Sequence, residues 1–499
     1  MMRKLLISAL FIVLASYSHA QSAYYKFDKD SKIIYEKLLY LQLDSADILI
    51  KQQKQSQPNN LIPLLLENYS DFLRLVLFED EDLFEQIKDR KKIRLNKWET
   101  GPKDNPWYLS GQAQIKLQWA FSRVLFDEYF TAATEINSAY HILEENKQKY
   151  PDFLADNMGI AILHAMIGVV PQKYQWAMEM FGLYGSISQG ISEMEIQLNQ
   201  DSQHPFAVES LFYYTFIELN LQTDTARFSK VLSYYQKQAY SKYSLKSPLL
   251  HFSKAVLLLK MDNDQAIEHF KSADFYKDAS HFYYSDFLMA QALLYKLEPE
   301  AIDYFNYYLS HYPGKNYKKA ALQKKAWSGF IHGDTALYLK AMSEIPGIGA
   351  SVFDADKVAE KESDMVADDW MPNLYLLRSR LQFDGHYYQG ALDELTGIEV
   401  STFNEQDRLE YHYRKARIYH EMKMIEAAKD EYALTLKKGH DSDRYFAAKA
   451  ALKLGEIAEV EEDTKAAETY YEEVLDLNFN EYRKGLRAKA KAGLQRVKK

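Results

Sequence analysis

The stretch RKARIYHEMKMIEAAKDEYALTLKKG, residues 414–439, decides the fold of this 499-residue chain. Ala416 and Tyr419 lie one helical turn apart, and after a short break Ala428 and Tyr432 repeat that spacing. Apolar residues at three- and four-residue steps are typical of helices that bury one face. The stretch therefore predicts two antiparallel helices, with small residues of one packed against large residues of the other.

A second copy follows in LKLGEIAEVEEDTKAAETYYEEVL, residues 452–475, where Gly455 and Ala458 precede Ala467 and Tyr471 at the same spacings. The interval from Ala416 to Gly455 is slightly longer than the unit of about 34 residues of the tetratricopeptide repeat, which this pattern resembles. Shorter copies occur upstream, in Ala266, Phe270 and Ala273; in Ala301, Phe305, Tyr308 and a closing Pro313; in Ala391, Leu395 and Ile398; and, more weakly, in Ala46, Ile50 and Pro58.

These repeats predict an all-α fold, an α-solenoid of antiparallel helix pairs that forms a right-handed superhelix of the tetratricopeptide type. The expected organisation along the chain is a signal peptide at 1–20, degenerate repeats at 21–346, an acidic loop or weakly packed connector at 347–369, and a C-terminal repeat array at 370–499.

The first 20 residues have the features of a cleaved secretory signal. Arg3 and Lys4 form a basic start, Leu5–Ser16 form an apolar run, and Ser18–Ala20 place small residues at the positions that signal peptidase reads. We expect Gln21 to be the mature N-terminus and the protein to be exported to the periplasm, or secreted, in a Gram-negative bacterium.

Composition narrows the classes of partner. The formal net charge of -9 becomes about -11 without the two basic signal residues, which argues against nucleic acid or an anionic membrane as the main partner. No later run reaches the roughly 18 apolar residues of a transmembrane helix, so none is expected in the mature chain. The absence of Cys excludes disulfides, thiolate metal sites and an N-terminal lipid anchor.

The glycine-rich stretch VPQKYQWAMEMFGLYGSISQG, residues 170–190, fails three catalytic patterns. Gly185 and Gly190 have the gap of a phosphate loop, but Ile191 follows where that loop needs Lys. Around Ser188 a nucleophile elbow lacks one glycine, and residues 176–181 read as helix where a dinucleotide site needs a strand.

We interpret this stretch as a corner between two helices. Pro171 would open the first helix, Gly182 would end it, and Gly185 would permit a tight reversal. Gly190 would let the second helix approach a neighbour closely.

Six residues of this corner resemble, at the same intervals, a segment of the tetratricopeptide repeat protein 39 family and its fungal relatives, the inclusion-body clearance factors: Pro171, Lys173, Glu179, Gly182, Gly185 and Gly190. The chain departs from that family at Leu183, where the family has Phe, and at residues 186–188, where the family has a charged group. The resemblance implies a repeat scaffold and no defined activity.

No metal, cofactor or catalytic set is expected. The 13 His residues include no pair at helical spacing with a third ligand nearby, since His412 and His420 lie two turns apart. The adjacent runs FEDEDLFEQ and KDRKKIRLNKW, within residues 78–98, are expected to pair with each other across a solvated face.

In helical-repeat arrays the first helix of each pair lines the concave surface, so its exposed residues are the default contacts. Here these candidates are Tyr413, Arg417, His420, Glu421, Lys449 and Glu456. The sequence therefore favours a non-catalytic, exported scaffold that binds a protein or peptide in its concave groove and associates peripherally with the cell envelope. Two alternatives stay open: a glycan or nutrient receptor of the outer-membrane type, and a hydrolase with Ser188 as its most visible nucleophile.

Overall fold

The computed structural model describes residues 22–170, 176, 178–199, 206–221 and 226–498. Every regular element among them is a helix, and their β pairing is limited to an isolated bridge between Tyr24 and Asn60. The predicted all-α fold is confirmed. Within the same residues, each helix is too short or too polar to cross a lipid bilayer.

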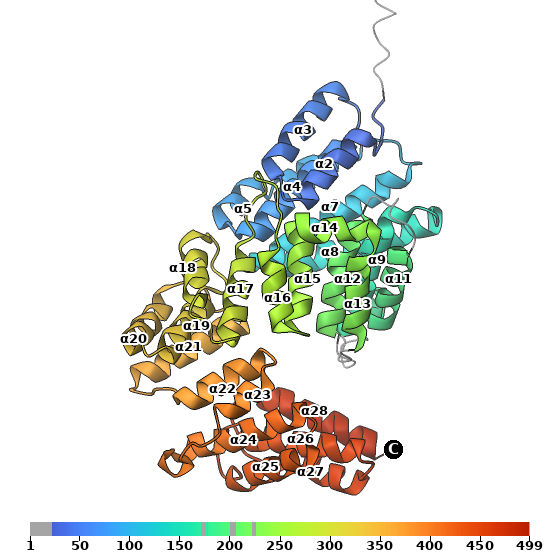
Figure 1. The fold of residues 1–499 in the computed structure, drawn as a ribbon. Coiled ribbons are helices and arrows are strands. Elements are labelled where there is room, and N and C mark those ends of the chain that lie inside the picture. Colours follow the sequence, from blue (N-terminus) through green and yellow to red (C-terminus); the bar gives the residue numbers. More distant parts are fainter. Residues whose placement is uncertain (1–21, 171–175, 177, 200–205, 222–225, 499) are drawn as a thin grey trace, which may run out of the picture. The chain divides into compact units, whose positions relative to one another are not determined.

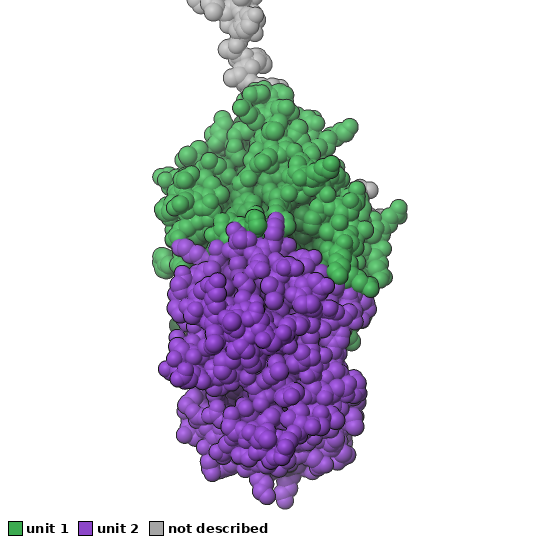
Figure 2. All heavy atoms as spheres, turned by 60° about the vertical axis from the view of Figure 1, so that its left-hand side comes forward, with its two compact units in different colours: residues 1–260, 268–285, 311–314 green, residues 261–267, 286–310, 315–499 purple. Residues whose placement is uncertain are grey.

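The chain forms two compact units (Figure 2). Unit 1 comprises residues 1–260, 268–285 and 311–314, and unit 2 comprises residues 261–267, 286–310 and 315–499.

The helices of unit 1, most of which are labelled in Figure 1, run in the order α2 (Lys29–Leu39), α3 (Leu43–Ser56), α4 (Ile62–Phe78), α5 (Glu81–Ile87), α6 (Arg90–Trp98), α7 (Pro106–Leu125), α8 (Tyr129–Lys149), η1 (Leu154–Asp156), α9 (Asn157–Val169), α11 (Ile187–Asn199), α12 (Ala207–Leu221), α13 (Ala226–Gln236), α14 (Gln238–Lys246) and α15 (Pro248–Leu259). Three helices contain residues of both units: α16 (Asn263–Lys271), α17 (Tyr283–Tyr295) and α18 (Ala301–His311).

The remaining helices belong to unit 2 and are α19 (Lys318–Ile331), α20 (Thr335–Glu344), η2 (Ile345–Gly347), α21 (Asp354–Ala367), α22 (Leu374–Asp384), α23 (Tyr388–Asp393), η3 (Val400–Thr402), α24 (Glu405–Glu421), α25 (Ile425–Lys438), α26 (Phe446–Val460), α27 (Thr464–Asp476) and α28 (Arg483–Val497).

The helices pack as a solenoid. Neighbours in sequence form the closest pairs, as in α7 with α8, α24 with α25, and α26 with α27. Helices two apart also contact one another, so that α22, α24, α26 and α28 form a continuous row (Figure 1). Each pair therefore covers the apolar face of the next pair, which is how repeat arrays build a core.

The small-on-large packing predicted from the repeats is present in the C-terminal pairs. Ala416 of α24 and Ala428 of α25 share one buried cluster with Tyr432. Gly455 of α26 lies against the ring of Tyr471 of α27. Tyr471 belongs to a second buried cluster, formed by the helices that follow. These contacts explain why a small residue recurs at one position and Tyr at the other.

The connector expected at 347–369 is a packed part of unit 2. Residues 354–367 form α21, which contacts α19 and α20. Asp356 is buried and its carboxylate accepts hydrogen bonds from the backbone N–H of Tyr317 (2.8 Å) and of Ala320 (3.0 Å) at the start of α19. The acidic residue caps a neighbouring helix, and most of this segment is a helix that packs against α19 and α20.

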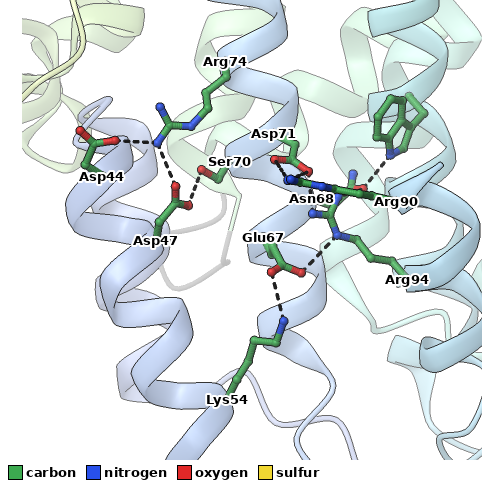
Figure 3. Close-up of polar contacts among 11 residues, drawn as sticks. Asp44, Asp47, Lys54, Glu67, Asn68, Ser70, Asp71, Arg74, Arg90 and Arg94 are labelled. Carbon is green, nitrogen blue, oxygen red and sulfur yellow. Dashed lines mark hydrogen bonds and ion pairs between the residues drawn. The ribbon is translucent and has the colours of Figure 1, made fainter. Parts of the chain in front are cut away.

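The charged runs at 78–98 do not simply pair with each other. Arg94 of α6 is buried, and its Nη2 donates to Asp71 of α4 at 2.6 Å (Figure 3). Its Nη1 donates to Asn68 at 3.1 Å, and Arg90 also reaches Asp71, at 3.0 Å. Lys88 does pair with Glu85, but the expectation of one solvated, mutually paired face is wrong, because α6 turns its arginines onto the carboxylates of α4.

Candidate functional site

A cavity of about 410 Å³ lies in unit 2. Its walls come from α19, α21, α22, α24 and α26 and from the segment before α28. This volume falls in the range of about 300–1,000 Å³ that is typical of ligand pockets. Trp327, Trp370, Leu376 and Leu377 give it an apolar wall, and charged side chains make up much of the rest.

Trp327 is fixed in this wall by polar contacts. Its Nε1 donates to Glu362 at 2.7 Å, and the same carboxylate accepts from Gln323 at 2.6 Å and from the hydroxyl of Tyr338 at 3.2 Å. Glu362 is therefore fully occupied by the protein's own donors. Burial, and then the nearby charge of Arg380, lower the pKa of Lys324, which lies beside Trp327, to about 8.

Arg380 brings a cation into the cavity without a carboxylate partner. Its guanidinium carbon lies 4.3 Å from the centroid of the Trp327 ring. Its Nη2 is buried and makes no hydrogen bond, and no ion pair of Arg380 occurs among the described residues. A buried donor without an acceptor costs about 1–3 kcal/mol.

The other arginines of the cavity are paired. Arg414 is buried and its Nε donates to Glu410 at 2.7 Å. Arg444 Nη1 lies 3.3 Å from Glu481, which also pairs with Lys361. These pairs shape the rim, whereas Arg380 forms no ion pair with another described residue.

Tyr413, one of the six residues predicted to line the concave surface, does not lie on the surface. Its ring is 3% exposed and packs in the core with Ala416, Tyr432 and Phe446. The expectation that Tyr413 is exposed is wrong, because it lies one turn before Ala416 and shares its buried face.

Arg417 and Lys449 are half-buried and lie on aromatic rings. The Arg417 guanidinium is 4.0 Å from the centroid of Phe383, and the Lys449 ammonium is 4.8 Å from that of Tyr445. Burial, followed by the charges of four neighbouring cations, lowers the pKa of Lys449 to about 8.

The three remaining candidates have different environments. His420 is half-buried, and burial lowers its pKa. Glu456 pairs with Lys453 at 2.7 Å, whereas Glu421 is exposed at the end of α24.

Of the three corner glycines, Gly185 and Gly190 lie against α9, and Gly182 lies near His141 of α8. Gly182 ends a helical segment with φ of +67°; its N–H bonds to Glu179 O at 2.9 Å, and Leu183 N–H bonds to Met178 O at 2.9 Å. This pair of bonds is the Schellman arrangement of a helix end.

A Cβ on Gly185 would lie 2.7 Å from the backbone of His164, and one on Gly190 would lie 2.5 Å from the carbonyl oxygen of Ala161. Two of the corner's glycines thus bring the chain against one helix. Pro171, the predicted start of the corner, lies outside the described residues. Ser188, the candidate nucleophile, is exposed and its Oγ lies 3.1 Å from Oγ of Ser186.

No sequence pattern predicted the cavity. Trp327, Trp370 and Arg380 belong to no motif, and only the packing of α19, α21 and α22 brings them together. No protein-family model matches this sequence, and no curated protein is significantly similar to it.

Proposed function

We propose that this protein is a non-catalytic helical-repeat scaffold that binds a protein or peptide partner at the cavity of unit 2. The carrying observation is the cavity itself, in which an apolar wall adjoins Arg380, a cation that forms no ion pair with another described residue. A polypeptide offers carbonyl or carboxylate oxygens that can contact the cation and apolar side chains that can pack on the apolar wall.

The repeat spacings and the packing of small on large residues support membership of the tetratricopeptide repeat superfamily. The basic and apolar pattern of residues 1–20 supports export through a secretory signal, a periplasmic or secreted location and peripheral association with the envelope. Fractionation of cells that express the full chain tests this location.

A glycan receptor is the runner-up, because two tryptophans line the cavity. Sugars stack on free aromatic faces, yet Trp327 already carries the Arg380 guanidinium and Tyr445 already carries the Lys449 ammonium, which leaves Trp370 as the second tryptophan for stacking. Two of the cavity's rings are thus engaged by the protein's own cations, which favours a peptide. A glycan array combined with thermal-shift measurements would separate the two partners.

Photo-crosslinking tests the proposal directly. A photoreactive phenylalanine replaces Tyr482, which is 59% exposed at the cavity, or, as a control, Phe130, which is 84% exposed in unit 1. We expect a discrete crosslinked protein at position 482 only, with a lower yield when Arg380→Gln is added and no change with Lys437→Gln in α25. Equal products at both positions, or no product at either, would contradict the proposal.

A further inference from the structure

We infer that the surface of unit 2 carrying Arg417, Lys449 and Lys489 binds an acidic segment of the partner polypeptide through that segment's carboxylates. This inference rests on the proposed function and names the chemical class of the partner. The three side chains come from α24, α26 and α28, which pack side by side in the row of alternate helices (Figure 1). We call them the basic triad.

None of the basic triad forms an ion pair with another described residue, although ion pairs surround it. The neighbouring cations are engaged: Arg414 with Glu410, Lys453 with Glu456 at 2.7 Å, and Arg496 with Glu459 at 2.6 Å. Glu410, Glu456 and Glu459 are thus used by other cations, and Glu421, which follows Arg417 by one turn, is exposed and forms no ion pair with it. The basic triad has three cations that are not paired with a carboxylate of the described residues.

Aromatic rings hold two members of the triad in place. The Arg417 guanidinium lies 4.0 Å from the centroid of Phe383, and the Lys449 ammonium lies 4.8 Å from that of Tyr445 and 5.5 Å from that of Tyr482. A ring face stabilises a cation without neutralising it. The side chains are therefore ordered and still able to bind an anion.

The triad's charges are close enough to act on one another. Burial, and next the charges of Arg417 and Lys489, lower the pKa of Lys449 to about 8, with Arg414 and Lys453 adding to the effect. Like charges held together disfavour the protonated lysine, whereas a bound carboxylate would favour it. Clusters of this kind are common where a protein binds an opposite charge.

The surface adjoins the cavity, and this adjacency indicates which kind of polypeptide fits both. Tyr445 and Tyr482 line the cavity and also lie beneath the Lys449 ammonium. A segment with acidic and apolar residues would place carboxylates on the triad and apolar side chains against Leu376 and Leu377. A uniformly charged polyanion would gain nothing from that wall.

The test uses the full mature chain and fluorescence anisotropy. The probes are a short peptide of Glu and Phe, fluorescein-labelled and amidated at its C-terminus, and its counterpart with every Glu replaced by Gln. We expect the acidic peptide to bind more tightly, its affinity to fall with added salt, and Arg417→Gln with Lys449→Gln to weaken it by about tenfold or more. Lys437→Gln, an exposed lysine of α25, is the matched control and should leave the affinity unchanged.

Equal affinity for the two peptides, no binding of either, or no effect of the double substitution would overturn the inference. So would tighter binding of a sulfated oligosaccharide or a single-stranded oligonucleotide. The crosslinking at position 482 tests the proposed function independently of the peptide measurements. A crosslinked partner, together with equal affinity for the Glu and Gln peptides, would therefore refute only the inference that the partner's segment is acidic. Circular dichroism of the double variant checks that it is folded.

A pH series adds a second readout. Lys449 loses its charge as the pH rises through about 8, and Lys324 of the cavity wall, whose pKa is also lowered to about 8, titrates in the same window, whereas Arg414 stays charged. The affinity of wild-type protein for the acidic peptide should therefore fall between pH 7 and pH 9, and Lys449→Gln should reduce that fall to the share contributed by Lys324. A pH response as large in Lys449→Gln as in the wild type would show that this lysine does not contact the anion.

Discussion

Gly455 of α26 faces one edge of the Tyr471 ring, and Gly493 of α28 faces the other. A Cβ on Gly455 would lie 2.6 Å from Cε1, and one on Gly493 would lie 2.5 Å from Cε2. The ring is fully buried, and its hydroxyl donates to Glu459 at 2.6 Å. Tyr471 is therefore held between three helices and cannot move aside for a larger residue.

Gly455→Val should accordingly destabilise unit 2, by about 2–3 kcal/mol, as overpacking of a core does. Urea denaturation followed by circular dichroism measures it. Gly485→Ala is the matched control, since nothing lies within 4 Å of its Cβ position, and removing a helical glycine there should be neutral or stabilising by up to about 1 kcal/mol. Equal stability of the two variants would refute the packing argument.

The glycine corner makes a second prediction. Gly185→Val places its Cβ 2.7 Å from the Cα and the carbonyl oxygen of His164, and backbone atoms cannot rotate away as a side chain can. Gly182→Val forces a branched residue into φ of +67°. We expect each to lower the melting temperature, with a cost of at least about 1–2 kcal/mol.

Gly347→Ala serves as the control for the corner, because its Cβ position is open and its φ is not in the left-handed region. Differential scanning fluorimetry compares the three variants. Unchanged melting temperatures for Gly182→Val and Gly185→Val would mean that the corner does not depend on its glycines.

The buried arginine of α6 gives a third prediction. Arg94→Met leaves the carboxylate of Asp71, of which only 11% of the side chain is exposed, with Arg90 as its remaining cation. Breaking a buried pair in this way should cost about 2–4 kcal/mol, since an incompletely neutralised charge stays in the core. Lys54→Met breaks an exposed pair with Glu67 and should cost less than about 1 kcal/mol in the same urea titration. Similar costs for both would show that the network is solvated.

Local patterns explain what could be predicted from the sequence. Ala416, Tyr432, Gly455 and Tyr471 repeat at helical spacing, so the helix pairs and their contacts follow from residues close in the chain. Tyr413, which we expected to be exposed, precedes Ala416 by one turn and therefore shares its buried face, a signal that the prediction overlooked.

Long-range packing explains the rest. Arg94 precedes the fully buried Trp98 by one turn. The basic run therefore includes one buried helix face, although its high charge indicated a fully solvated helix. The cavity has no such signal. Trp327 and Arg380 come from different helices, and their stacking depends on how α19 and α22 pack.

A stacked pair of histidines predicts how unit 1 responds to acid. His251 of α15 and His269 of α16 lie with ring centroids 4.0 Å apart, and both are buried. Burial lowers the pKa of His251 to about 4; burial, with the charges of His251 and Lys254, lowers that of His269 to about 3.

An unfolded histidine has a pKa of about 6.5, so between that pH and about 4 the unfolded chain binds more protons than the folded protein. Stability is therefore complete above about pH 7 and falls as the pH drops through this window, by up to about 1.4 kcal/mol per pH unit for each imidazole. Urea titrations from pH 7 to pH 5 should show this slope, and His269→Phe, which keeps the stacking and removes one titrating ring, should reduce it by about half. His440→Phe removes an exposed imidazole, whose pKa is raised by its hydrogen bond to Asp441, and should not reduce the slope. An identical slope in wild type and His269→Phe would show that the pair does not govern acid stability.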